Sequence, residues 1–339
     1  MIGRMPRNVL IVKLSAMGDV LQALDGLEAL DLPAGQNRIV WAVKAGLEPL
    51  FAGVSSVAEV ISVPKSLWHW HALRPRVGGQ RFDITVDLQG LAKSHLLARF
   101  LGCREIVSGG TLESRDWLSP RFSARTLDWR APTARAWYGG LIHWALAGRL
   151  PDPPIQRPRA QPPARGVKDV RRVLCAPGAA WPTKRLPLAS WLKLLTGARA
   201  AFPGAALALL QGTGGEERAF AAALAQQAAS QGLALLPPLS LEALKSEILS
   251  AQVYLGMDSG PGHWAARLGL ETLLFYGPSL PAYYDRSASP PAHARGTCHL
   301  GVTFRTRCPN LRRCNSCSAL ESADAESAFA EFLAARFVP

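Results

Sequence analysis

Short apolar segments alternate with segments of helical spacing along most of the chain, and this alternation restricts the fold more than any other feature. Buried parallel strands read as short apolar runs, and the helices that connect them show an apolar stripe. In the N-terminal half, we predict strands at residues 9–12, 39–43, 57–63 and 84–90, an edge strand at 105–107, and helices at 20–30, 92–101 and 134–147.

A proline-rich segment interrupts the alternation once. Six prolines lie between Leu150 and Gly166, which predicts a stiffened linker. Beyond it we predict strands at 173–176, 207–210, 253–255 and 272–275, and helices at 187–201, 216–229, 241–249 and 263–268. The pattern predicts two Rossmann-like, doubly wound α/β domains facing a cleft. The predicted divisions are an N-terminal domain 1–150, a linker 151–166, a C-terminal domain 167–320 and a final helix 321–339.

Composition limits the class of protein and its partners. The chain of 339 residues is 48% hydrophobic and 19% charged, with a net charge of +13 at pH 7. This balance indicates a globular protein, and no apolar run is long enough to span a bilayer. We therefore expect a cytoplasmic protein. The charge fits an anionic membrane surface or a phosphorylated substrate, whereas the absence of a basic stripe with interleaved aromatic residues disfavours nucleic acid.

The most prominent polar turn is the stretch that runs from Gly256 to His263. It follows an apolar strand and precedes a segment of helical spacing, so it presents backbone N–H groups at a helix N-terminus. Such a turn suits a phosphate group. The alternative is that its glycines serve only close packing between strand and helix.

Two other turns carry charged side chains that complement this one. Lys184 stands just before a predicted helix and, with the Gly256–His263 turn, provides the positive groups that hold a diphosphate leaving group. Asp19 stands in the first turn of the chain, where a carboxylate suits a general base for an acceptor hydroxyl. The alternatives are a solvated surface lysine and an aspartate that only complements a helix dipole.

Four of the six cysteines lie in the loop-like tail: Cys298, Cys308, Cys314 and Cys317. The two-residue gap in Cys314-Asn-Ser-Cys317 allows both thiolates to reach one metal ion. The tail therefore forms a structural zinc or iron site or holds reduced, unliganded thiols.

Four segments in this order resemble the ADP-heptose:lipopolysaccharide heptosyltransferases of glycosyltransferase family 9, and within them the heptosyltransferase I branch. They are Val9-Leu-Ile-Val-Lys-Leu-Ser-Ala-Met-Gly-Asp-Val20, Asp87-Leu-Gln-Gly-Leu-Ala-Lys-Ser94, Pro177-Gly-Ala-Ala-Trp-Pro-Thr-Lys184, and Gly256-Met-Asp-Ser-Gly-Pro-Gly-His263 with Tyr276-Gly-Pro278. The resemblance implies a glycosyltransferase-B fold, an acceptor site in the N-terminal domain, and a final helix packed on that domain.

The resemblance also implies roles for individual residues. Asp19 is the expected general base and Lys184 the expected phosphate-binding lysine. The residues expected at the donor are Leu239, Ser240, Asp258, Ser259, Gly260 and His263, with Glu216 and Glu217 near the donor sugar. The residues expected at the acceptor are Ser15, Gly18, Lys93, Arg115 and Arg135.

The function expected from the resemblance is inverting transfer of heptose from ADP-heptose to an inner-core sugar of lipopolysaccharide, without an obligatory metal, at the inner face of the cytoplasmic membrane. Three departures from the family bear on this: Ala179 and Ala180 replace hydroxyl residues, 66–71 replaces a more basic loop, and the tail bears cysteines. A different core sugar or a protein therefore stays open as acceptor, as does a non-catalytic nucleotide-sugar-binding protein.

Overall fold

The computed structural model describes residues 6–30, 32–33, 35–73, 81–110, 118–153, 155, 169–179, 184–276 and 322–337. The chain divides into two compact units, unit 1 (Met1–Pro158) and unit 2 (Arg159–Pro339). Arg115 and the four tail cysteines lie outside the described residues, as does most of the proline-rich segment. No helix in these ranges is long and apolar enough to cross a membrane.

Unit 1 is built on a six-stranded parallel sheet of order β3-β2-β1-β4-β5-β6. Its strands are β1 (Arg7–Val12), β2 (Asn37–Lys44), β3 (Glu59–Val63), β4 (Phe82–Asp87), β5 (Cys103–Gly109) and β6 (Arg125–Leu127). The segment around 105–107 was expected at an edge of the sheet. This expectation is wrong, since β5 pairs with β4 on one side and with the short strand β6, which was not predicted, on the other.

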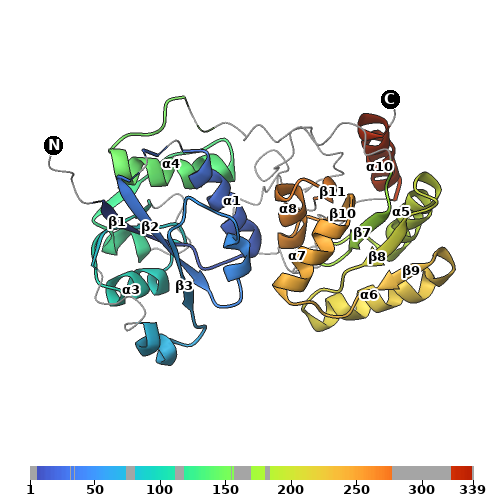
Figure 1. Cartoon of the computed structure of the whole chain (residues 1–339), viewed down its shortest axis with the longest axis horizontal. Helices are drawn as coiled ribbons and strands as arrows, with labels where there is room; N and C mark the ends of the chain where they lie inside the picture. Colours follow the sequence, from blue (N-terminus) through green and yellow to red (C-terminus); the bar gives the residue numbers. More distant parts are fainter. Residues whose placement is uncertain are drawn as a thin grey trace. The chain divides into compact units, whose positions relative to one another are not determined.

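Helices cover both faces of this sheet. They are α1 (Met17–Glu28), α3 (Ala92–Phe100) and α4 (Ala134–Ala147), with the 3₁₀ segments η1 (Glu48–Phe51), η2 (Leu67–Ala72) and η3 (Ser119–Phe122). On one face, Leu10 and Val12 of β1 share a core with Leu97 of α3. Elsewhere in unit 1, α1 and α4 lie side by side (Figure 1), so closely that a Cβ on Gly26 would stand 2.7 Å from the Arg135 carbonyl oxygen.

Unit 2 is built on a five-stranded parallel sheet of order β11-β10-β7-β8-β9. Its strands are β7 (Arg172–Ala176), β8 (Ala206–Leu209), β9 (Leu233–Leu235), β10 (Val253–Met257) and β11 (Glu271–Phe275). Its helices are α5 (Leu188–Ala201), α6 (Gly215–Gln227), α7 (Leu241–Ser250), α8 (Gly260–Arg267) and α10 (Ser322–Arg336), with the 3₁₀ segment η5 (Ala229–Gln231).

The final helix packs within unit 2. Phe329 and Phe332 of α10 are buried in the same core as Trp191 of α5 and Phe275 of β11, and α10 lies beside α5 in Figure 1. The resemblance implied packing on the N-terminal domain. The apolar side chains on the buried face of α10 complete the core of unit 2, and packing of this helix on the N-terminal domain stays a prediction.

Each sheet has one point where strand order reverses. In unit 1 this point lies between β1 and β4, and in unit 2 between β7 and β10. Connections from the two central strands leave in opposite directions at such a point, and doubly wound α/β proteins bind their ligands there, at the carboxyl ends of the strands. The four segments quoted above for the resemblance begin in or directly after these four strands.

Candidate functional site

A cation, a carboxylate and an imidazole meet at the reversal point of unit 2. Asp258 directly follows β10, and its backbone N–H donates to the carbonyl oxygen of Phe275 at 2.9 Å. Lys184 Nζ donates to Asp258 Oδ2 at 2.5 Å. His263 Nε2 lies 2.9 Å from Asp258 Oδ1. The structure thus brings three of the predicted site residues together in one cluster, hereafter the Asp258 cluster.

The Asp258 cluster holds its carboxylate ionised. Burial would raise the pKa of Asp258, but the Lys184 ammonium and the His263 ring outweigh burial and hold this pKa well below its usual range. An ionised carboxylate only accepts hydrogen bonds, so His263 Nε2 carries the proton that it shares with Asp258. The cluster therefore contains a fixed negative charge with a cation on one oxygen and an imidazole N–H on the other.

The other ring nitrogen of His263 is buried without a hydrogen-bond partner among the described residues. The His263 side chain is only 5% exposed. A buried polar atom that lacks a partner is costly, which points to a group that occupies this position in the functional state. Because Nε2 carries a proton, Nδ1 donates to such a group only when the ring is an imidazolium.

The start of α8 adds backbone donors to the cluster. Ser259 is the N-cap residue, and the first helical hydrogen bond runs from the His263 N–H to the Ser259 carbonyl oxygen at 3.1 Å. The N–H groups of Gly260 and Gly262 therefore lie outside the helical hydrogen bonding. The helix begins three residues before the predicted start at residue 263, so His263 is the fourth residue of α8 rather than its first.

Close packing also accounts for two of the glycines in this stretch. A Cβ on Gly256 would stand 2.5 Å from the ring of Tyr254, and one on Gly262 would stand 2.6 Å from Leu274 Cδ2. The packing alternative therefore holds for these two positions. It does not account for Asp258, Lys184 or the unpartnered nitrogen of His263.

The start of α6 places Glu217 beside the loop that follows β7. Glu217 Oε2 accepts from the Gly214 N–H at 3.0 Å, and its Oε1 lies 3.2 Å from the position of a Cβ on Gly178. Glu216 is exposed and pairs with Arg185 Nη1 at 3.5 Å. Of the two glutamates, Glu217 is the one whose side chain lies against Gly178, and a contact with the donor sugar stays a prediction for both.

The remaining donor-site candidates lie at the start of α7. Ser240 is the N-cap residue of this helix, and its Oγ accepts from the Ala243 N–H at 3.2 Å. Leu239 precedes it and is half-buried. The geometry gives Ser240 a structural role, and a contact with a base stays a prediction for both residues.

In unit 1, Asp19 lies in the first turn of α1 and pairs with a lysine from the end of β1. Lys13 Nζ lies 3.4 Å from Asp19 Oδ2, and its side chain is 2% exposed against 17% for Asp19. The ammonium also lies 5.0 Å from the centre of the Tyr138 ring. Residues Ser15 and Gly18 form the same turn and are half-buried. The pairing of Lys13 with Asp19 was not predicted.

The other acceptor-site candidates are distributed elsewhere in unit 1. Lys93 Nζ donates to the Lys65 carbonyl oxygen at 2.8 Å and lies 5.7 Å from the Trp70 ring. Arg135 is buried in the contact between α1 and α4, with its Nε 3.9 Å from Asp25 Oδ2. This buried ion pair accounts for one contact of Arg135, and its acceptor role stays a prediction.

Comparison with known proteins identifies the family. The family model for glycosyltransferase family 9 (heptosyltransferase) matches residues 70–309. Lipopolysaccharide heptosyltransferase 1 of Pseudomonas aeruginosa is 28% identical over 88% of this chain and 84% of its own length. The Salmonella typhimurium protein of the same name is 26% identical over 81% of this chain and 89% of its own length.

Solved structures agree with this assignment. The structure of Escherichia coli heptosyltransferase WaaC with ADP-2-deoxy-2-fluoro heptose matches with a TM-score of 0.71 at 23% identity, over 96% of this chain and 99% of that one. The predicted glycosyltransferase-B fold class, with two parallel-sheet α/β domains, is confirmed. The chain belongs to glycosyltransferase family 9, the heptosyltransferase family, and is a glycosyltransferase.

Proposed function

We propose that this enzyme transfers heptose from ADP-heptose to an inner-core sugar of lipopolysaccharide with inversion at the anomeric carbon. The observation that carries the proposal is the Asp258 cluster, which lies where a doubly wound sheet binds its ligand. The E. coli relative with the same fold was solved with a fluorinated ADP-heptose, and this supports the same class of donor.

The Asp258 cluster is suited to a departing diphosphate. As the bond between the anomeric carbon and the diphosphate oxygen breaks, its electron pair stays on ADP. The groups that stabilise this charge are the Lys184 ammonium, the N–H groups at the start of α8 and the His263 ring. Asp258 holds the lysine and the histidine in place, so it acts on the phosphates through its neighbours.

Asp19 is the proposed general base. The acceptor hydroxyl oxygen attacks the anomeric carbon from the face opposite the diphosphate, and its proton passes to the Asp19 carboxylate. Lys13 pairs with this carboxylate at 3.4 Å, a distance that favours its ionised form without a short, strong hydrogen bond. The partly exposed Asp19 side chain is accessible to an acceptor sugar, whereas Lys13 is not.

No metal ion takes part in this proposed reaction, since Lys184 and a helix N-terminus supply the positive charge at the diphosphate. Unchanged turnover in excess EDTA is the expected result, and activity that requires an added divalent cation would contradict it. A structural zinc or iron ion at the tail cysteines is a separate proposal, tested by elemental analysis of the purified protein.

We further propose that the enzyme works as a peripheral protein at the inner face of the cytoplasmic membrane. The segment η2 presents Trp68 with 88% of its surface exposed and Leu67 with 49% exposed. Lys93 Nζ lies 5.7 Å from the centre of the Trp70 ring in this segment. Exposed tryptophan with neighbouring lysines suits an anionic lipid surface. Trp68→Ala should reduce co-sedimentation with vesicles that contain anionic phospholipid, and binding equal to wild type would contradict the proposal.

The function is tested by a transfer assay with defined sugars. The enzyme is incubated with ADP-heptose or ADP-glucose, and with a lipopolysaccharide inner-core acceptor or a protein acceptor. Product masses identify the pair used, and NMR of the product gives the anomeric configuration. Heptosylated inner core of inverted configuration is expected. A modified protein would shift the acceptor assignment, and ADP binding without any transfer would favour a non-catalytic nucleotide-sugar-binding protein.

A further inference from the structure

Gln89 is a buried polar residue for which the proposed reaction has no role. Its side chain belongs to the turn after β4, and the residue is 5% exposed. Its amide oxygen accepts two backbone hydrogen bonds, from the Leu14 N–H at 3.0 Å and from the Ser15 N–H at 3.1 Å. These N–H groups belong to the turn that joins β1 to α1, the helix whose first turn carries Asp19.

The register of the sheet places Gln89 at this turn. Strands β1 and β4 are parallel neighbours, and Val12 is paired with Asp87. Two residues further along each strand, Leu14 and Gln89 lie side by side beyond the last paired residues. The Leu88 N–H still donates to the Val12 carbonyl oxygen at 3.0 Å, and beyond it the Gln89 side chain reaches across and continues the contacts between the two strand ends.

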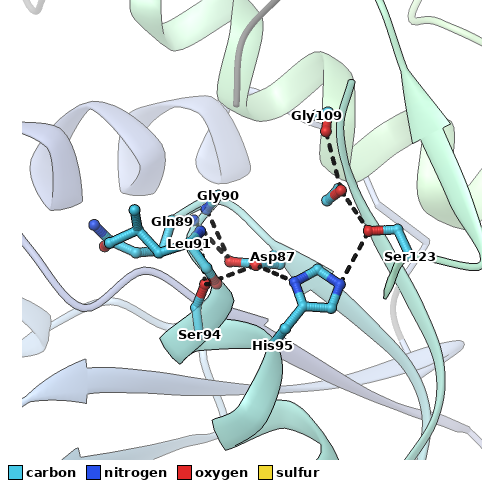
Figure 2. A network of polar contacts seen from close by, with 9 residues as sticks. Asp87, Gln89, Gly90, Leu91, Ser94, His95, Gly109 and Ser123 are labelled. Atoms are coloured by element: carbon cyan, nitrogen blue, oxygen red, sulfur yellow. Dashed lines mark hydrogen bonds and ion pairs between the residues drawn. The ribbon is translucent and has the colours of Figure 1, made fainter. Parts of the chain in front are cut away.

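Asp87 shapes the turn that presents Gln89. Asp87 Oδ1 accepts from the backbone N–H groups of Gln89 at 2.9 Å and Gly90 at 3.2 Å, as Figure 2 shows. Asp87 Oδ2 accepts from Ser94 Oγ at 2.7 Å. Gly90 has a φ of +65°, a conformation that favours glycine. The carboxylate therefore fixes the backbone on which the glutamine stands.

A second set of contacts fixes Asp87 itself. His95 of α3 places Nδ1 3.0 Å from Asp87 Oδ2 and Nε2 3.0 Å from Ser123 Oγ (Figure 2). Ser123 Oγ in turn lies 2.6 Å from Ser108 Oγ of β5. Asp87 and His95 are 1% and 3% exposed. The chain of contacts thus runs from β5 through α3 and β4 to the end of β1.

We propose that Gln89 is a positioning residue for the transfer reaction. Asp87 holds Gln89 in place, and Gln89 fixes the backbone that presents Asp19 to the acceptor hydroxyl. This inference rests on the proposed role of Asp19 as the base. The two hydrogen bonds to Gln89 Oε1 fix the backbone between Lys13 and the start of α1, and so fix both partners of the Lys13–Asp19 pair relative to one another. A base displaced by a fraction of an ångström from its near-attack position transfers protons more slowly.

The test compares two substitutions at Gln89 in the full-length enzyme. Gln89→Met keeps the length of the side chain and removes the acceptor oxygen. We expect kcat with ADP-heptose to fall about tenfold to a hundredfold, with the KM for ADP-heptose unchanged, because the donor site lies in unit 2. Gln89→Glu retains an oxygen that accepts both N–H groups, so kcat should return to within about threefold of wild type.

The pH–rate profile separates positioning from general support of the fold. The carboxylate of Gln89→Glu opposes ionisation of a nearby base, so the acidic limb of the profile should move to higher pH. Gln252 in unit 2 provides the matched control, since its Oε1 accepts from the N–H groups of Arg171 and Arg172, both at 3.0 Å. Gln252→Met loses the same kind of contact and should leave kcat and the pH profile unchanged.

The outcomes distinguish this inference from the proposed function. If Asp19→Asn abolishes transfer while Gln89→Met retains wild-type kcat, the inference is wrong and the function stands. If Gln252→Met lowers kcat as much as Gln89→Met, the effect is one of stability and the inference is again wrong. If Asp19→Asn retains full turnover, the proposed function itself fails. Should Gln89→Met not fold, Gln89→Glu decides alone, and an unshifted acidic limb overturns the inference.

Discussion

Replacing Lys184 by alanine should destabilise unit 2, because it removes the cation from the buried Asp258 carboxylate. Asp258 has a 5% exposed side chain and Lys184 a 17% exposed one. Breaking a fully buried ion pair costs about 3–5 kcal/mol, and since water can reach part of the lysine site, we expect about 2 kcal/mol here. Lys193→Ala is the control: Lys193 and Glu326 form a pair that is 58% and 46% exposed, so its loss should change stability by less than about 0.5 kcal/mol.

The effect of Lys184→Ala should depend on pH with a definite sign. The folded protein lowers the pKa of Asp258. Its stabilising contribution is therefore fully present above the ordinary aspartate pKa of about 4 and is lost as the pH falls below that value. Without Lys184, burial is opposed only by His263 and the pKa rises. The difference in stability between wild type and variant should thus be largest above pH 4 and should narrow as the pH falls below 4.

Urea unfolding followed by fluorescence at pH 7 and at about pH 3 measures both effects. The double variant Lys184→Ala, Asp258→Asn removes the uncompensated charge. Its free energy of unfolding should therefore exceed that of Lys184→Ala alone by at least about 1 kcal/mol. A single variant as stable as wild type at pH 7, or a double variant less stable than the single one, would refute the reasoning.

Three further predictions concern packing and burial. Gly26→Ala should lower the stability of unit 1 by about 1–3 kcal/mol in urea unfolding, because its Cβ would stand 2.7 Å from backbone atoms of α4. The control is Gly204→Ala, whose Cβ meets nothing within 4 Å and which should be neutral. Equal losses of stability in the two variants would contradict the packing account. Burial raises the pKa of Cys175 to about 12, so mass spectrometry should find it unmodified by iodoacetamide at pH 8 in the folded enzyme and modified in urea. Phe332→Ala should lower stability by about 3–5 kcal/mol in thermal unfolding, and a loss under about 1 kcal/mol would show that α10 does not complete the core.

The sequence was sufficient to predict the fold class and the central strands. Each central strand is an apolar run buried on both faces, and each carries its polar turn at the carboxyl end, as in β1 and β10. The edge strands β6 and β9 were missed. Both have three residues, none of them buried, so their residues show no pattern that distinguishes a strand from a loop.

Residues of the candidate site were predictable where a charged side chain stands in a turn after a strand. They were less predictable where the role depends on a hydrogen-bond or ion-pair partner that only the fold brings close. Asp258 and Lys184 were identified because charged residues at strand ends are informative. Lys13 was overlooked as a partner because a lysine after a strand is more often at the surface. Gln89 was overlooked because its partners are backbone N–H groups, which every sequence contains, and only the register of β1 and β4 brings them together.

The central claim is that Asp19 takes the acceptor proton while the Asp258 cluster holds the donor. Asp19→Asn tests it most directly when transfer and ADP binding are measured on the same preparation. Asp83→Asn is the control, since the exposed Asp83 carboxylate accepts from the Asn8 N–H at 2.9 Å. We expect kcat for heptose transfer to fall by about 10²–10⁴ in Asp19→Asn, with the Kd for ADP unchanged and Asp83→Asn fully active. Transfer within about tenfold of wild type in Asp19→Asn would contradict the account.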